Sequence, residues 1–193
     1  MKITIPYILS ENAQGISTYR IEDSMFSERK IILDGTIDHD MAAAITTQLL
    51  HLSQTDSAEP VTIYINSPGG NFADGMTIYD MMQAMPCDVN TICTGLAASM
   101  AALIFSVGNN RQMLPHSTVM VHEPYIPSTG GDMFDLENRA KHLKSLREDY
   151  CKILAERSGK TTKEVYAALH KETWFTAQEA IDFGLCDEIL NSL

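Results

Sequence analysis

Two glycine-containing turns follow apolar segments of this sequence, and the second is followed by a serine. The first turn spans residues 67–70, after the β-branched segment 61–65, and the second begins the small-residue stretch 95–102. Ser99 lies in that stretch, where a strand is expected to give way to a helix, and its small neighbours allow close approach of backbone and substrate. Ser99 is therefore a candidate nucleophile, although a serine at a helix start is also a common N-cap without chemistry.

Acyl transfer needs a nucleophile, a base that takes its proton and amide donors for the developing oxyanion. The Met100 amide, at the expected helix start, and the Gly70 amide, in a turn without side chains, are the candidate donors. His122 follows the expected strand Thr118–Val121, and loops at strand ends commonly carry sites, so it is the candidate base, although a lone histidine there is often structural. We interpret the other histidines as solvated or capping residues: His39, His51, His116, His142 and His170.

Composition excludes several function classes. The 25 acidic and 14 basic residues give a net charge of −11, which argues against nucleic-acid binding, since that needs clustered cations. The four cysteines form no Cys-x-x-Cys pair, which disfavours a zinc site and fits a reducing compartment. No apolar secretion signal is found near Met1, and the longest apolar stretch, residues 95–108, is too short to cross a membrane. The sequence predicts a cytoplasmic protein without metal, nucleic-acid or membrane partners.

Short strands and helices alternate along the chain, which predicts a single α/β domain. Strands are expected at 30–33, 61–65, 89–93 and 117–121, and helices at 39–52, 73–85, 97–107, 133–157, 162–169 and 177–183. The longest helix carries one apolar stripe, made of Leu136, Ala140, Leu143, Leu146, Tyr150 and Ile153. This stripe indicates either a core-facing helix or an oligomer contact, and the pattern alone does not decide between them.

The segments around these residues resemble those of the Clp protease proteolytic subunit family (ClpP). The resemblance lies in the ordered motifs at 65–70, 75–80, 91–100, 120–124 and 179–187, and it extends from about residue 29 to 189. It implies a spiral of ββα units of the ClpP/crotonase type with a long protruding handle helix. One peptidase domain would cover residues 1–193, with a gating and docking segment at 1–25 and the handle region at about 126–158.

The same resemblance implies a function and residue roles. Ser99 would be the nucleophile, His122 the general base and later the acid, and Gly70 and Met100 the oxyanion hole. The protein would be a serine endopeptidase of ATP-dependent proteolysis that cuts unfolded polypeptides inside a chamber of two stacked seven-membered rings. An AAA+ Clp ATPase would feed the chamber, so the chain itself would need no cofactor.

The third member of the catalytic triad departs from the family pattern. The family places an aspartate eight residues before an alanine that corresponds to Ala180, and the residue there is Glu172. We assign Glu172 as the acid, with an exposed surface glutamate as the alternative. Asp132 and Asp135 are more remote candidates, and Glu123 should point away from His122 because neighbouring side chains on an extended strand face opposite sides.

Two further segments depart from the family. Residues 127–132 stand where the family has a glycine-rich strand that pairs with substrate and with the opposite ring, and residues 10–19 replace its usual gating-hairpin pattern. These differences suggest a divergent second paralogue, which would work in mixed rings. A weakly active or regulatory ring subunit therefore remains an alternative. A further alternative is an acyl-CoA enzyme of the crotonase type. The presence of Ser99 and His122 disfavours it, because crotonases do not need that nucleophile.

Overall fold

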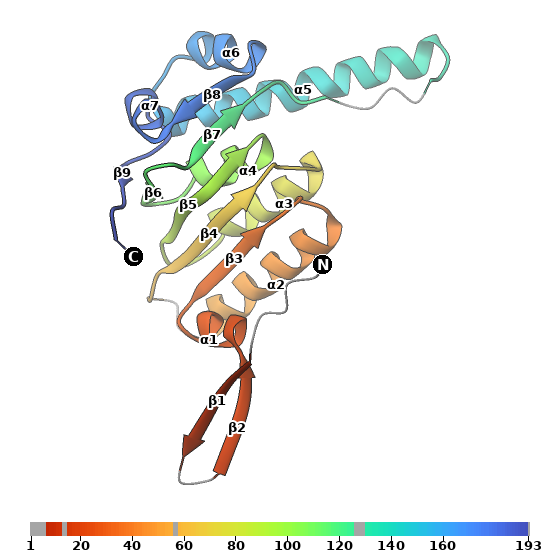
Figure 1. Ribbon diagram of the computed structural model, residues 1–193. Helices are drawn as coiled ribbons and strands as arrows, with labels where there is room; N and C mark the ends of the chain where they lie inside the picture. Colours follow the sequence, from red (N-terminus) through yellow and green to blue (C-terminus); the bar gives the residue numbers. More distant parts are fainter. Residues whose placement is uncertain (1–6, 13–14, 56–57, 126–129, 193) are drawn as a thin grey trace, which may run out of the picture.

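The computed structural model describes residues 7–12, 15–55, 58–125 and 130–192. Its centre is a seven-stranded sheet in which β3 (Lys30–Asp34), β4 (Val61–Ser67) and β5 (Val89–Ala98) run parallel. The helices α2 (His39–Thr55) and α3 (Phe72–Gln83) connect these strands and lie side by side on one face of the sheet (Figure 1). The predicted α/β class is confirmed.

Helical periodicity gives α2 one core face. Its buried residues recur at spacings of three and four: Ala42, Ile45, Leu49 and Leu52. In β4 buried and less buried residues alternate, as expected for a strand with unequal faces. The buried residues of α2 and β4 belong to one hydrophobic core.

The sheet forks at β5, and the fork creates the corner that carries Ser99. The first half of β5 pairs with β6 and the second half with β7, both in parallel. Beyond the fork, β9 pairs with β6, while β8 pairs antiparallel with β7. The bounds are Arg111–Met113 for β6, Thr118–Val121 for β7, Thr173–Thr176 for β8 and Glu188–Ile189 for β9.

Helices α4 and α5 differ in how much of each is buried. Every residue of α4 (Met100–Ser106) is buried. The buried residues of α5 (Met133–Ser158) all lie between Tyr150 and Ala155, whereas its first turns project beyond the sheet (Figure 1) and expose Phe134 to 76%. The core-facing interpretation of the apolar stripe is therefore right for its end, which lies against the core, whereas its beginning has no cover within the described chain.

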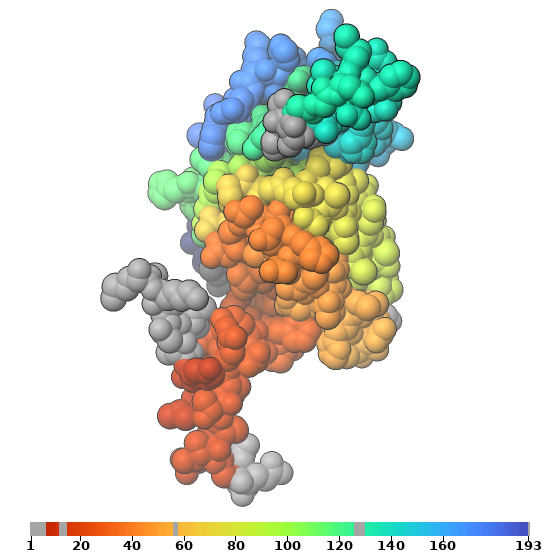
Figure 2. Space-filling view, turned by 90° about the vertical axis from the view of Figure 1, so that its right-hand side faces the viewer, coloured from red at the N-terminus to blue at the C-terminus, as the bar shows by residue number. Residues whose placement is uncertain are grey.

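The N-terminal part forms a hairpin of β1 (Tyr7–Asn12) and β2 (Gly15–Arg20), followed by α1 (Ile21–Ser27). The hairpin extends away from the sheet, on the opposite side of the molecule from α5 (Figures 1 and 2). The two strands pair antiparallel from Tyr7 opposite Arg20 to Asn12 opposite Gly15, because this pairing needs backbone partners more than particular side chains.

The remaining helices are α6 (Thr162–His170) and α7 (Ala177–Phe183), close to the predicted ranges. The strand predicted at 89–93 continues to Ala98, so the helix predicted from residue 97 begins at Met100. The predicted departure at 127–132 lies partly outside the described residues, since 126–129 are not described. Across the described ranges, no helix combines the length and apolar character that a membrane span requires.

Candidate active site

Ser99 occupies a strained backbone position between β5 and α4. Its φ of 55° and ψ of −122° lie in a region that residues with a side chain rarely adopt, at a cost of order 1–3 kcal/mol. The Ser99 N–H donates to the Met120 carbonyl of β7 at 2.8 Å, and the Ser99 carbonyl accepts from the Ala102 and Leu103 amides of α4. The surrounding bonds therefore hold the serine in a sharp, partly exposed turn, as a nucleophile requires.

The glycine turn after β4 packs directly against this corner. A Cβ on Gly69 would lie 2.7 Å from the Cβ of Ser99 and 3.0 Å from the Met100 nitrogen, so only glycine fits there. A Cβ on Gly70 would overlap the Ile37 carbonyl oxygen. Among the described residues, neither the Gly70 nor the Met100 N–H donates a hydrogen bond within the chain. Two unpaired amides thus lie next to Ser99, as an oxyanion hole requires.

His122 follows β7 directly and is half buried. Its Nδ1 lies 2.7 Å from the backbone carbonyl oxygen of Glu123. Because a carbonyl can only accept, this contact places the proton on Nδ1 and leaves Nε2 with the lone pair that a general base needs. The Glu123 carboxylate, as predicted, faces elsewhere and contacts Arg147 and His170.

Glu172 lies two residues before the partner of Met120 and immediately before β8. The ladder between β7 and β8 ends at the pair Val121 and Thr173, which are the direct sequence neighbours of His122 and Glu172. Glu172 also has a positive φ of 53°. Its side chain is exposed, and Oε1 accepts a bond from the Trp174 indole at 3.4 Å. Within the described residues, no hydrogen bond joins Glu172 to His122, or His122 to Ser99.

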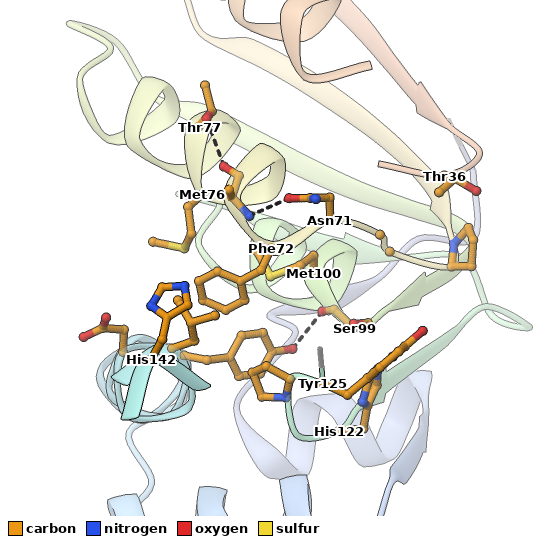
Figure 3. A pocket seen from close by; sticks show the side chains of 18 of the residues that line it. Thr36, Asn71, Phe72, Met76, Thr77, Ser99, Met100, His122, Tyr125 and His142 are labelled. Atoms are coloured by element: carbon orange, nitrogen blue, oxygen red, sulfur yellow. Dashed lines mark hydrogen bonds between the residues drawn. The ribbon is translucent and has the colours of Figure 1, made fainter. Parts of the chain in front are cut away.

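A cavity of about 950 Å³ gathers four of the five predicted site residues: Gly70, Ser99, Met100 and His122. Figure 3 shows Ser99 and His122 on one side of it, with Phe72 and Met76 of α3 on the other. Glu172 is not among the described residues that line it. The more remote candidates Asp132 and Asp135 instead cap the N-terminus of α5 by bonding to each other's backbone amides.

Comparison with known proteins agrees with this geometry. The family model described as Clp protease matches residues 12–192. A protein named ATP-dependent Clp protease proteolytic subunit from Bacteroides fragilis is 39% identical to this chain, over 96% of this chain and 90% of the relative. A protein of the same name from Bacteroides thetaiotaomicron is 38% identical, over 96% of this chain and 84% of the relative. One from Streptococcus pneumoniae is 37% identical over 98% of this chain and 99% of the relative. The chain belongs to the Clp protease family.

Membership of the Clp protease family makes the chain a serine endopeptidase and confirms the predicted fold and enzyme class. It also removes the crotonase-type acyl-CoA alternative, which rested on the shared fold and paired amide donors. No group of three or more histidine, cysteine or acidic side chains among the described residues is arranged to hold a metal ion.

The sequence of this Clp family member did not predict that three further residues lie at the site. Tyr150 was placed on the α5 stripe without a role, yet its hydroxyl reaches the Ser99 carbonyl. His142, interpreted as solvated, is exposed but also lines the cavity. Tyr125 lines it as well, and its ring lies 6.0 Å from that of His122. The periodicity of α5 placed Tyr150 on the apolar stripe but did not decide whether the stripe faces the core, and no sequence signal identified what Tyr150 contacts.

Proposed function

We propose that this chain is the proteolytic subunit of an ATP-dependent Clp protease and that Ser99 and His122 carry its peptide hydrolysis. The observation that carries the proposal is the strained Ser99 turn, which lies between two unpaired amides and shares a cavity with His122. A merely structural N-cap would use its side chain for the α4 amides, but the Ser99 side chain makes no capping bond.

In the proposed mechanism His122 takes the proton of the Ser99 hydroxyl as Oγ attacks the substrate carbonyl carbon. The carbonyl oxygen becomes an oxyanion, which the Gly70 and Met100 amides stabilise. The carbon–nitrogen bond then breaks, and His122 gives its proton to the leaving amine. Water, activated by the same imidazole, releases the acyl group and restores the serine.

The walls of the cavity support unfolded polypeptides as substrates. Phe72, Met76 and Leu146 line it together with the buried Met100 and Tyr150. Such walls accept a large apolar side chain next to the cleaved bond. Folded proteins keep these side chains inside, so a chain must be unfolded before it can present them.

We assign Glu172 as the third member of the triad. The register of β7 and β8 supports this assignment, because it pairs Val121 with Thr173, the sequence neighbours of His122 and Glu172. Engagement requires the carboxylate to leave the Trp174 indole and the Nδ1 of His122 to leave the Glu123 carbonyl. The Glu172 side chain is exposed and that of His122 is half buried.

The proposed assembly consists of two stacked seven-membered rings in the cytoplasm, with an AAA+ Clp ATPase that unfolds and feeds substrates. The handle region, residues 126–158, would join the rings, and its exposed Met133, Phe134 and Leu136 supply apolar area for such a contact. The segment 1–25 would form the gate and docking region at the outer end. In this scheme ATP is used by the partner, and this chain needs no cofactor.

The decisive experiment is covalent labelling of the purified protein with a fluorophosphonate probe. We expect one adduct, on Ser99, together with hydrolysis of a fluorogenic peptide. In Ser99→Ala both should disappear, with a loss of rate of roughly 10⁴-fold or more. A folded, ring-forming wild-type protein that neither labels nor hydrolyses peptide would refute the proposed catalytic role.

A second candidate function is a weakly active or regulatory ring subunit that works with a more active paralogue. The observation that favours it is the arrangement of the acid and base, since Glu172 and His122 each bond elsewhere in the single chain. The two functions separate when Ser99 labelling is timed for the chain alone and in mixed rings with the paralogue. Equal rates support the first function, and labelling only in mixed rings supports the second.

A further inference from the structure

Tyr150 links the handle helix to the backbone of the nucleophile. The residue is 1% exposed, and the centre of its ring lies 6.5 Å from that of Phe72. Its hydroxyl donates a hydrogen bond of 2.7 Å to the Ser99 carbonyl oxygen, drawn as the dashed line at Ser99 in Figure 3. Burial raises the pKa of the Tyr150 phenol, so the hydroxyl stays protonated and remains a donor at working pH.

This hydrogen bond is not needed to satisfy the carbonyl it reaches. The Ser99 carbonyl already accepts from the amides of Ala102 and Leu103 at 3.0 and 3.3 Å, the first bonds of α4. Removing the Tyr150 hydroxyl would therefore leave no buried acceptor without a donor, and the expected cost in stability is small. The effect of the Tyr150 hydrogen bond is therefore to be found in the Ser99–Met100 peptide group that it contacts.

The Ser99 carbonyl and the Met100 N–H are the two ends of one planar peptide unit, and in a trans peptide they point in opposite directions. A donor that fixes the carbonyl therefore also fixes the direction of the Met100 N–H, one of the two proposed oxyanion donors. The unit follows a residue with a φ of 55°, a conformation that persists only when surrounding contacts enforce it. A bond to the carbonyl also polarises the peptide and makes its N–H a stronger donor.

We propose that Tyr150 is a positioning residue of the oxyanion hole: its hydroxyl, through the Ser99–Met100 peptide, orients the Met100 amide toward the developing oxyanion. This inference rests on the proposed function of Ser99. The tyrosine touches neither the substrate carbonyl nor the reacting atoms of the mechanism. Its effect should therefore appear in the stabilisation of the tetrahedral state and not in the binding of the substrate.

The test is Tyr150→Phe in the full-length, assembled protein, which keeps the ring against Phe72 and removes the hydroxyl. We expect kcat for a fluorogenic peptide to fall about tenfold, less than the loss of a whole oxyanion donor, with KM within about twofold of wild type. The affinity for a peptide boronate, whose tetrahedral adduct on Ser99 places an oxygen at the two amides, should weaken by the same factor. The pH profile of kcat/KM should keep its shape, since the tyrosine transfers no proton.

The matched control is Tyr79→Phe, which removes the hydroxyl of a half-buried tyrosine on α3 that does not line the cavity. Its kcat and boronate affinity should match wild type. Rates are expressed per Ser99 titrated to completion with fluorophosphonate, so misfolded molecules do not count. An unchanged kcat in Tyr150→Phe overturns the inference, as does a fall in kcat without weaker boronate binding. If wild-type Ser99 itself fails to label, the proposed function fails instead, which distinguishes the two failures.

Discussion

Ser99 and Glu172 are both non-glycine residues with positive φ, at 55° and 53°, but their surroundings differ. Ser99 sits beside the fully buried α4, and four hydrogen bonds hold its backbone N–H and carbonyl. Glu172 is exposed, and its amide makes one bond of 3.4 Å to Leu169. The nucleophile is thus rigidly held within one chain, whereas the proposed acid is held by a weak local turn.

This difference shows which part of the site a single subunit determines. The turn at Ser99, the two amides and the His122 tautomer all follow from contacts within the described chain. The contact between Glu172 and His122 does not, although the strand register favours it. We infer that the nucleophile half is preformed and that the acid half depends on side-chain rotation, so substitutions in the two halves should have effects of different size.

The largest effect in this comparison is expected from Gly70→Ala, which breaks the preformed half. The added methyl group would overlap the Ile37 carbonyl, so the turn must shift and its amide must leave the oxyanion site. We expect kcat to fall by about 10²–10³-fold, as for the loss of one oxyanion donor. Steady-state hydrolysis of a fluorogenic peptide measures it.

The matched control for this prediction is Gly159→Ala at the end of α5. Gly159 also has a positive φ, 69°, but a Cβ there would meet nothing within 4 Å. The variant should lose about 1–2 kcal/mol of folding free energy from backbone strain and keep its kcat. Equal kcat losses in both variants would mean that the Gly70 result reports lower stability and not a lost donor.

A smaller effect is expected from Glu172→Ala, which removes the acid half and leaves the rings intact. Loss of a triad acid can cost about 10⁴-fold when nothing else fixes the histidine tautomer. Here the Glu123 carbonyl already places the proton on Nδ1 of His122, so we expect a loss of about 10–10²-fold in kcat/KM. Peptide hydrolysis, with gel filtration to check assembly, measures this loss.

The control is Glu172→Asp, which keeps the charge on a side chain shorter by one methylene group. It should retain most of the activity that Glu172→Ala loses. If Glu172→Ala hydrolyses peptide at the wild-type rate, the glutamate has no part in the mechanism, and the Glu123 carbonyl alone suffices to orient His122.

The sequence predicted the features that depend on local pattern. Helical periodicity predicted a helix at 39–52, where α2 lies, and turn and strand-end signals selected Ser99, Gly70 and His122, which line one cavity. The end of β5 was missed because a buried parallel strand is apolar throughout, so the small residues before Ser99 resembled a helix. The short strands β6, β8 and β9 were missed because two to four residues carry no readable alternation.

Features that depend on distant contacts were not accessible from the sequence. The Tyr150 bond to Ser99 joins residues 51 positions apart, and the apolar stripe left open whether the ring faces the core or an oligomer partner. Family spacing selected Glu172, but the opposing register of residues 121 and 173 became visible only in the sheet. Where the Glu172 side chain points was unpredictable, because a single exposed hydrogen bond to Trp174 decides it.

That bond gives the smallest and most specific prediction, Trp174→Phe. The indole N–H contacts Glu172 Oε1 at 3.4 Å on an exposed part of β8, and phenylalanine keeps a ring there without a donor. Because an exposed hydrogen bond is weak, releasing the carboxylate toward His122 should raise kcat/KM by only about twofold. The same change in a Glu172→Ala background should have no effect, as a double-mutant cycle tests. An equal gain in both backgrounds would show that the tryptophan acts through its ring, and Glu172 would then not be restrained by the indole at all.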